Sequence, residues 1–372
     1  MRINIAASHR FHLLDLAREL EILGHEVRFY SYVPTRRAIK YGLKKESSFS
    51  LFVIMLPFLI LVKLSKKPSF SLKLVNWALD TYLSFFMKPC DVYIALGTVY
   101  KKSFVTAKKR FNAVTILEWG SKHIEEQQRI LSQIPKAVQQ DRYSLNRSLT
   151  GYKLADYIAI ASDHVKQSFI ERGVSEHKLI QNPYGVDLSM FSPTELSSDE
   201  IYDVIMVGGW RYEKGCDLLV DYFEKSSLTF LHVGTIINLD FPKFSNMTHI
   251  DSVDQTKLIN YYKKAKVFVL PSRAEGLAMV QAQALACGLP IVCTKDTGGR
   301  DLRNMLKDKK WIIELEDFNI EALDKAIKEA LILAATQTSI RSYTTNIMNS
   351  LDWKAYGLRY NENLENICIN VK

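Results

Sequence analysis

The sequence predicts an α/β protein in which two doubly wound, Rossmann-like domains face a central cleft. Two observations support this prediction. The chain has 372 residues, more than one hydrophobic core usually organises. In both halves, short apolar runs alternate with longer stretches of helical periodicity, and such strand–helix–strand units form right-handed crossovers in a parallel sheet. The composition, 47% hydrophobic and 24% charged, is typical of a globular protein and excludes a disordered or fibrous one.

Residues 1–190 are expected to form the first domain. An apolar run at 3–7 precedes leucines at helical spacing, and Gly24 fits the position just after that helix. A β-rich run at 27–33 completes the first strand–helix–strand unit. The segment 46–87, which is rich in Phe and Leu, interrupts the alternation. Further strands are predicted at 91–96, 113–117 and 157–161.

Residues 201–350 are expected to form the second domain, after a polar linker at 194–200. Residues 351–372 are expected to form a helix that packs back against the first domain. Parallel sheets bind ligands at the carboxyl ends of their strands, so the cleft between the two domains is the default ligand site. The strands of the second domain are predicted at 203–207, 229–233, 248–251, 267–270, 290–293 and 311–315, with helices at 215–225, 255–264, 278–287 and 319–335.

Composition and pattern also exclude several kinds of protein. The five cysteines form no Cys-x-x-Cys pair, which argues against a disulfide framework and a structural zinc site. No signal peptide is visible before the first strand. The longest apolar run, at 51–62, is shorter than the roughly 20 residues that span a bilayer. We therefore expect a cytoplasmic protein.

The strongest chemical signal is a strand–loop–helix unit at 267–290. The strand ends in Pro-Ser-Arg-Ala-Glu-Gly, and a helix is predicted to begin after Glu275 and Gly276. A glycine lets the backbone approach a ligand closely, and free N–H groups at Gly276, Leu277 and Ala278 would attract an anion. The alternative is an ordinary connection in which Glu275 only caps the helix.

A second loop follows the strand at 203–207. Gly208 and Gly209 lead into a loop that carries Arg211 and Lys214 just before the next helix. A guanidinium and an ammonium group at a helix start suit a diphosphate. The loop is neither a P-loop nor a GxGxxG dinucleotide fingerprint. A solvated lysine beside a glycine turn is the alternative, but two such loops at the ends of parallel strands favour a nucleotide-phosphate site.

Across residues 150–310 the sequence resembles the retaining GT-B glycosyltransferases of family 4, the glycosyl transferases group 1 type. The N-terminal half matches more loosely, through Leu-Gly-His-Glu-Val at 23–27. The resemblance implies the GT-B fold, with an acceptor-binding first domain and a second domain that binds a nucleotide-diphosphate sugar as co-substrate, with no cofactor. The matching motifs follow the family's order: Gln-Asn-Pro-Tyr-Gly-Val-Asp at 181–187, Val-Gly-Gly at 207–209, Lys-Gly at 214–215, Leu-Pro-Ser-Arg-Ala-Glu-Gly at 270–276 and Ala-Cys-Gly-Leu-Pro at 286–290.

The resemblance also implies roles for individual residues. Lys214 would hold the donor diphosphate together with Arg211, which stands in for a family arginine whose usual position is occupied here by Gly209. Glu275 would face the hydroxyl groups of the donor sugar. The family's second glutamate, eight positions further on, is Gln283 here. Its amide can accept a hydrogen bond from a ribose hydroxyl but carries no charge.

In the first domain, His123 resembles the family histidine that contacts the donor sugar near the reacting carbon, although a lone histidine is more often structural. Ser8 and His9 occupy the place of the family's glycine-rich first loop. The cations of the second domain would stabilise the charge on the leaving phosphate. No Asp-x-Asp motif occurs, which disfavours the metal-dependent class, so we expect no metal ion.

The positive charge is confined to the first half of the chain. Residues 1–190 carry 28 basic and 16 acidic groups, a net charge of +12, whereas residues 191–372 carry 21 and 24, a net charge of −3. Lysines and arginines flank the apolar run at 51–62. Cations around a short apolar segment favour a helix that rests on an anionic membrane. The alternatives are a core helix pair with snorkelling lysines, or nucleic acid, for which no binding motif is present.

These observations predict a retaining, metal-independent hexosyltransferase that acts at the inner face of the cell membrane. It would move a sugar from a nucleotide sugar to a glycan or lipid-linked acceptor in surface polysaccharide or glycolipid biosynthesis. Two alternatives stay open. A sugar-nucleotide epimerase shares the fold, but those enzymes lack the Lys-Gly and Glu-Gly loops in this arrangement. A nucleotide-sugar-binding protein without activity is conceivable because of Gln283 and the missing first-loop glycines.

Overall fold

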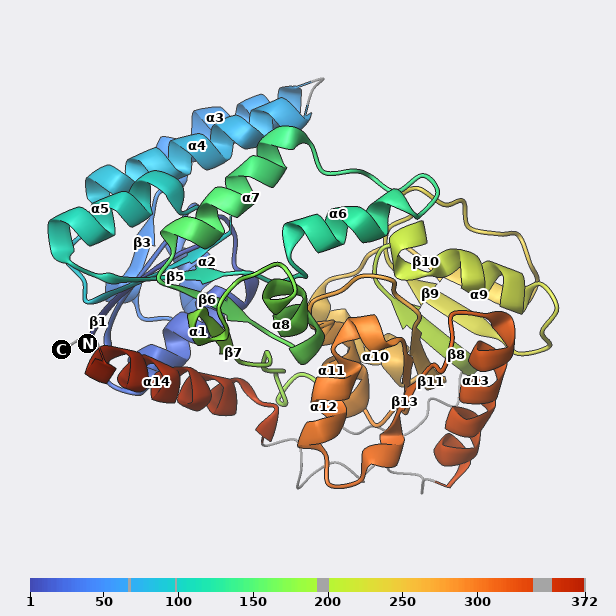
Figure 1. Ribbon diagram of the computed structural model, residues 1–372. Helices are drawn as coiled ribbons and strands as arrows, with labels where there is room; N and C mark the ends of the chain where they lie inside the picture. The colour runs from blue at the N-terminus through green and yellow to red at the C-terminus, as the bar shows by residue number, and fades with distance from the viewer. Residues whose placement is uncertain (66–67, 98, 193–200, 337–349, 371–372) are drawn as a thin grey trace.

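The computed structural model describes residues 1–65, 68–97, 99–192, 201–336 and 350–370, and it consists of two α/β domains side by side (Figure 1). Each domain is a parallel sheet with helices on its two faces, so the predicted fold class is confirmed. The predicted linker at 194–200 lies outside the described residues. No helix within the described ranges combines the length and the apolar character that a membrane span requires.

The first sheet has seven parallel strands in the order β3-β2-β1-β4-β5-β6-β7. The order reverses direction between β1 and β4, and such a switch point opens a crevice at the carboxyl ends of the strands. Five strands coincide with predicted ones, and the three-residue strands β3 and β7 were not predicted. The strands are β1 (Arg2–Ala6), β2 (Glu26–Ser31), β3 (Ser48–Ser50), β4 (Val92–Leu96), β5 (Val114–Glu118), β6 (Tyr157–Ile160) and β7 (Leu179–Gln181).

Helices cover both faces of this sheet because its strands are apolar on both sides. In β4, Ile94 packs into the core shared with α1, whereas Tyr93 and Ala95 pack into the core on the opposite face, with α4 and α5. The helices are α1 (Phe11–Ile22), α2 (Thr35–Lys40), α3 (Phe52–Leu64), α4 (Pro68–Phe86), α5 (Lys101–Phe111), α6 (Ile124–Ser132), α7 (Arg142–Leu154) and α8 (Asp163–Ile170), with short 3₁₀ turns η1 (Lys45–Ser47) and η2 (Glu176–Lys178).

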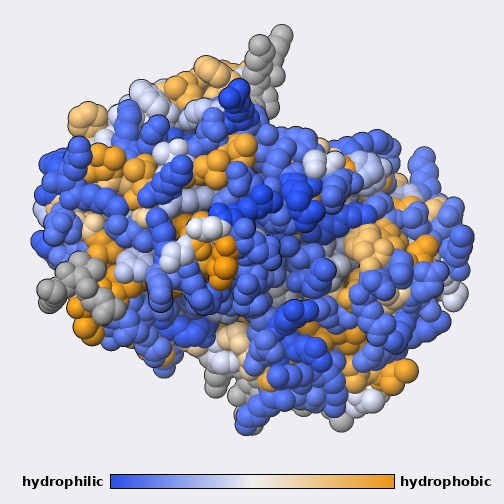
Figure 2. Space-filling model, viewed as in Figure 1, coloured by the Kyte–Doolittle hydropathy of each residue, from blue (hydrophilic) through white to orange (hydrophobic). Residues whose placement is uncertain are grey.

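The segment rich in Phe and Leu forms a pair of adjacent helices, α3 and α4, along one edge of the first domain (Figure 1). Met55, Leu79 and Leu83 are fully buried against the sheet. Other apolar side chains of the pair point outward, and in Figure 2 they lie along the upper edge of the molecule. The pair is therefore only partly a core element. Its outward apolar residues are at least 38% exposed: Val53, Ile54, Leu56, Ile60, Leu61, Leu64, Phe70, Leu72, Trp77, Phe85 and Phe86.

The second sheet has six parallel strands in the order β10-β9-β8-β11-β12-β13. All six strands match predicted ones, while α12 was not predicted. The strands are β8 (Tyr202–Val207), β9 (Phe230–Val233), β10 (Met247–Ile250), β11 (Ala265–Leu270), β12 (Ile291–Cys293) and β13 (Ile312–Glu314). The helices are α9 (Cys216–Phe223), α10 (Ile259–Tyr262), α11 (Met279–Ala286), α12 (Gly299–Met305) and α13 (Ile320–Ala335), with 3₁₀ turns η3 (Tyr212–Lys214), η4 (Gln255–Lys257), η5 (Lys295–Thr297) and η6 (Lys309–Trp311).

The C-terminal helix, α14 (Trp353–Asn370), crosses back to the first domain as predicted and packs along α1 (Figure 1). The Tyr360 hydroxyl donates a 2.7 Å hydrogen bond to the buried carboxylate of Glu118, at the end of β5. The other oxygen of that carboxylate lies 3.0 Å from Nε2 of His12 on α1. The end of the chain therefore fixes the carboxyl edge of the first sheet, which faces the second domain.

Candidate active site

The two loops singled out in the second domain meet at one edge of its sheet. β8 and β11 are neighbouring parallel strands, so the loops that follow them emerge side by side. Gly215, at the end of the first loop, has φ = +71°, and a Cβ atom there would lie 2.0 Å from the Pro271 carbonyl oxygen of the second loop. A side chain at position 215 would force the loops apart. The Lys-Gly and Glu-Gly motifs are therefore parts of one site.

Lys214 and Glu275 form an ion pair at this junction, and their side chains are 16% and 17% exposed. The Ser272 hydroxyl lies 3.0 Å from the Glu213 carbonyl oxygen and 3.3 Å from Oε1 of Glu275. Burial and, secondarily, the Arg211 guanidinium lower the pKa of the Lys214 ammonium to about 8. This cation is poorly hydrated and lies next to a second one, an environment that favours an anionic ligand.

Arg211 is the second cation of the site. Its Nε atom is buried, and within the described part of the chain it has no hydrogen-bond partner. A buried guanidinium N–H without an acceptor is unfavourable, and a ligand oxygen would relieve that penalty. Arg211 and Lys214 together carry two positive charges against the single carboxylate of Glu275, so the junction has positive charge to spare.

Arg273 was not singled out from the sequence, and it braces the same junction. Its guanidinium donates to both carboxylate oxygens of Asp217, each at 2.7 Å, and to the Tyr212 carbonyl at 2.6 Å. It also stacks on the ring of Phe318 at 4.1 Å. A bidentate contact of this kind fixes geometry as well as charge. Only the presence of an arginine in a loop after a strand signalled it, because Asp217 is 56 residues away in the chain.

The remaining loop residues lie close to this pair. The Gly208 carbonyl accepts a hydrogen bond from His232 at 2.8 Å, and Gly209 lies against Ile237. Ala278 is the N-cap of α11 without a side-chain cap, and Leu277 precedes it. The prediction of a free N–H at Ala278 is wrong, because that group donates to the Thr297 carbonyl at 3.2 Å. The chain at 294–297 runs beside the helix start and uses this donor.

Gln283 is 5% exposed on α11, and its Oε1 lies 3.3 Å from the Tyr262 hydroxyl. Its side chain is thus occupied within the second domain. The ribose contact expected for Gln283 stays a prediction.

His123 begins α6 in the first domain and is 3% exposed. Its ring packs between Tyr152 and Phe169, at 4.9 and 5.1 Å between ring centroids, and its Nδ1 accepts from the Glu125 N–H. The structure therefore gives this ring a packing and capping role and does not bring it to the Lys214–Glu275 pair. Its contact with a donor sugar stays a prediction.

Two cavities lie between the domains, on either side of the place where the loop after β5 meets the loop after β11. One, of about 650 Å³, is lined by Lys122 and Glu126 of the first domain and by Arg273 and Asp296 of the second. The other, of about 450 Å³, is lined by His12, Gly120 and Leu277 among others. The loops touch at Gly276, where a Cβ would lie 1.8 Å from the Gly120 carbonyl oxygen.

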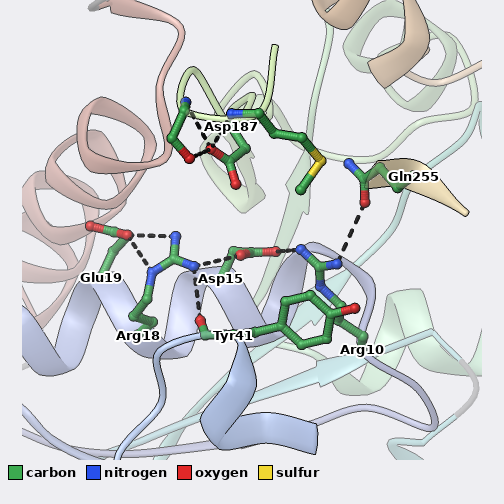
Figure 3. A network of polar contacts seen from close by, with 9 residues as sticks. Arg10, Asp15, Arg18, Glu19, Tyr41, Asp187 and Gln255 are labelled. Atoms are coloured by element: carbon green, nitrogen blue, oxygen red, sulfur yellow. Dashed lines mark hydrogen bonds and ion pairs between the residues drawn. The ribbon is translucent and has the colours of Figure 1, made fainter. Parts of the chain in front are cut away.

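The smaller cavity contains a charged network that the sequence did not reveal (Figure 3). The Arg10 guanidinium lies 3.7 Å above the Tyr41 ring, 3.4 Å from Asp15 and 3.5 Å from Gln255 of the second domain. Asp15 also pairs with Arg18 at 2.8 Å. Arg10 follows Ser8 and His9 in the first loop, so a cation stands near the place where a glycine-rich loop was sought.

Asp301 is a buried carboxyl group at the domain boundary. It accepts hydrogen bonds from the Asp163 N–H at 2.8 Å and the Gln181 amide at 3.0 Å, both from the first domain. Burial and then the nearby charge of Asp163 raise its pKa to about 6. The folded state therefore binds a proton between pH 4 and 6 that the unfolded chain releases, so this group's contribution to stability is lost as the pH rises through 6.

Asp301→Asn is expected to raise the free energy of unfolding by up to about 3 kcal/mol at pH 8 and to have no such effect at pH 4. The amide keeps an acceptor for both donors and removes the buried charge. Thermal or urea unfolding at the two pH values measures this difference. Asp251→Asn, at a side chain that is 96% exposed, is the matched control. An equal gain at both pH values would contradict the assignment of the raised pKa to Asp301.

Comparison with known proteins agrees with this geometry. Residues 192–346 match the family model for glycosyl transferases group 1. The chain is 23% identical over 195 residues to a phosphatidylinositol N-acetylglucosaminyltransferase of Arabidopsis thaliana, covering 47% of this chain and 43% of that protein. It is 33% identical over 134 residues to the putative teichuronic acid biosynthesis glycosyltransferase TuaC of Bacillus subtilis, covering 32% and 33%. The chain thus aligns with less than half the length of these relatives.

The similarity of fold extends over the whole chain. Sucrose-phosphate synthase from Thermosynechococcus elongatus superposes with a TM-score of 0.71 at 17% identity and full coverage of both chains. Anabaena HepE in complex with UDP-glucose superposes with a TM-score of 0.63 at 13% identity, over 98% of this chain and 100% of that one. The second domain of this chain is therefore a member of the glycosyl transferases group 1 family, and the chain as a whole has the GT-B fold of two facing doubly wound domains.

Proposed function

We propose that the protein is a retaining glycosyltransferase that moves a hexose from a nucleotide-diphosphate sugar to a glycan or lipid-linked acceptor. The observation that carries the proposal is the buried pair of Lys214 and Glu275 beside an Arg211 whose Nε lacks a partner among the described residues. The family match at 192–346 and the UDP-glucose bound to the structurally similar HepE support a nucleotide sugar as the donor.

In the proposed reaction, the bond between the anomeric carbon and the diphosphate oxygen breaks, and the acceptor oxygen bonds to that carbon on the same face. The acceptor's proton passes to the leaving phosphate. Positive charge develops on the sugar and negative charge on the phosphate, which Lys214 and Arg211 would stabilise. Glu275 would accept hydrogen bonds from sugar hydroxyls. The two side-chain cations supply the charge that a metal ion supplies elsewhere, and the chain has no Asp-x-Asp motif.

The test begins with a thermal-shift screen of nucleotide sugars, because a ligand that binds the folded state raises the unfolding temperature. A donor found in this way is then used in transfer assays with EDTA present, and the anomeric configuration of the product is read by NMR. Retention without added metal supports the proposal. A donor that binds but is neither hydrolysed nor transferred would indicate a binding protein, and acceptor-free interconversion of two donor sugars would indicate an epimerase.

We propose further that the acceptor is presented at the cytoplasmic face of an anionic membrane, on which the α3–α4 pair rests. Phe70 and Phe85 are 68% and 72% exposed on this pair, and Lys63, Lys101 and Lys102 are exposed near it. Exposed apolar side chains with neighbouring lysines suit an interface with anionic lipid better than they suit water. The names of the Arabidopsis and Bacillus relatives, which refer to a phosphoinositide and a wall polymer, agree with a membrane-bound acceptor.

The double variant Phe70→Ser/Phe85→Ser is expected to bind vesicles of anionic phospholipid at least about tenfold more weakly than the wild type, because each ring would otherwise be removed from water. Vesicle flotation at low and high salt measures this binding. Ile332→Ser is the matched control, since that side chain is 67% exposed on α13 of the second domain. Wild-type binding that is insensitive to anionic lipid and to salt would contradict the membrane proposal.

A further inference from the structure

The turn that carries Glu275 belongs to the second domain, but side chains of the first domain hold its backbone. The Ser162 hydroxyl, which follows β6 and is fully buried, donates to the Gly276 carbonyl at 3.0 Å. Nε2 of His164, on α8, lies 3.0 Å from the Glu275 carbonyl oxygen. A carbonyl oxygen only accepts, so Nε2 carries the proton and the imidazole donates. Two consecutive carbonyl groups of the turn are thus satisfied across the domain boundary.

The other side of the same turn is also tied to the first domain, through one intermediate. The Glu275 N–H donates to the Asp296 carbonyl at 2.9 Å, and the carboxylate of Asp296 pairs with Lys122 at 2.7 Å. Both side chains of this pair are mostly buried, at 11% and 23% exposure. The N–H and the C=O of Glu275 are therefore both fixed by contacts that depend on the two domains being together.

Lys214 has a different support. It ends the short turn η3, whose neighbours Tyr212 and Asp217 are braced by Arg273 within the second domain. If the domains separate, Lys214 keeps its surroundings, whereas the Glu275 turn loses two hydrogen bonds. The position of the Glu275 carboxylate relative to the ammonium is then set by domain closure.

We propose that Ser162 and His164 are positioning residues of the donor site, which hold the Glu275–Gly276 turn so that the Glu275 carboxylate meets Lys214 and the donor sugar only in the closed molecule. The role of the donor sugar rests on the proposed function, but the clamp on the turn does not. Burial lowers the pKa of His164 to about 4, so the ring is neutral above pH 5 and retains the single proton that Nε2 donates. The contact is therefore constant over the pH range in which an assay would be run.

The first arm of the test needs no substrate. Amide hydrogen exchange is followed in the segment 271–278 of the intact protein, because its Glu275 and Ala278 N–H groups are hydrogen-bonded. Ser162→Ala and His164→Ala are each expected to speed exchange there about tenfold, the effect of losing one buried hydrogen bond. Strand β11 should exchange as in the wild type. His164→Gln, whose amide can still donate, should restore slow exchange, and Lys166→Ala on the same helix should change nothing.

The second arm uses UDP-glucose, or the donor found in the screen, and measures kcat/KM for transfer or hydrolysis. Each alanine variant is expected to lower kcat/KM about tenfold with a melting temperature near that of the wild type, and His164→Gln to recover most of it. Unchanged exchange and unchanged kcat/KM would overturn the positioning role. Faster exchange in a protein whose wild type binds and turns over no nucleotide sugar would leave the clamp standing and reject the proposed function.

Discussion

Replacing Lys214 with alanine is expected to lower kcat for sugar transfer by about 10²–10³-fold, the size of effect that follows the loss of one group aimed at developing negative charge. The ammonium lies in a mostly buried junction, next to Arg211 and paired with Glu275. Without it, Arg211 would face the leaving diphosphate alone, and the Glu275 carboxylate would be left near that anion without its partner. Both changes raise the energy of the transition state.

A pH profile gives this prediction a second, independent signature. The pKa of Lys214 is lowered to about 8, so the ammonium form is present below that pH and is lost above it. The kcat/KM of the wild type should therefore decline as the pH rises through about 8, since this parameter follows ionisations of the free enzyme. Lys214→Arg, which stays charged, should lose activity through altered geometry but should lack this alkaline decline.

The control for Lys214 is Lys225→Ala, at an exposed lysine just after α9 in the same domain. It removes the same charge at the surface and should leave kcat within about twofold, because exposed charges are screened by water and salt. Transfer by Lys214→Ala at near wild-type rate, with a folded protein and saturating donor, would contradict the role assigned to the ammonium.

Much of the fold was accessible from the sequence because its strands are apolar on both faces and its helices have a clear period. All six strands of the second sheet were predicted, as was the return of α14 to the first domain. The strands β3 and β7 have three residues each, too few to show a period, and their pairing with longer neighbours is set by tertiary contact. The linker prediction concerned residues outside the described ranges.

The candidate site was partly accessible for a related reason. Lys214 and Glu275 stand in loops after neighbouring strands, so topology alone brings them together. Arg273, Ser162 and His164 act through partners 56 to 114 residues away, and no local pattern encodes such contacts. His123 was selected by its place after a strand, but the direction of its ring depends on Tyr152 and Phe169, which come from two other helices.

The asymmetry of charge acquires a structural meaning from the arrangement of the two domains. The second domain, at −3, presents its few cations individually, and the site needs only Lys214 and Arg211. The first domain, at +12, contributes both the exposed α3–α4 pair and the residues that clamp the Glu275 turn. A membrane contact made by the first domain would therefore lie on the body that also closes over the donor site.

Gly276→Ala is expected to lower kcat/KM by at least about 100-fold, comparable to the effect of misplacing a reacting group by about 1 Å. A Cβ at this position would lie 1.8 Å from the Gly120 carbonyl oxygen and 2.6 Å from its carbon. Both are backbone atoms, which cannot turn aside as a flexible side chain can. Either the two domains move apart or the Glu275 turn shifts, and each outcome separates the carboxylate from its place beside Lys214.

The control for this variant is Gly24→Ala, where φ is +90° and a Cβ would meet no atom within 4 Å. It introduces backbone strain without a contact between the domains, so it should lower the free energy of unfolding by about 1 kcal/mol and leave kcat/KM nearly unchanged. Gly276→Ala should show the reverse balance, because the clash lies at the domain boundary and both domain cores stay intact. Near-normal transfer by Gly276→Ala would mean that the loops after β5 and β11 are not in contact during the reaction, and the closed arrangement would then have no part in catalysis.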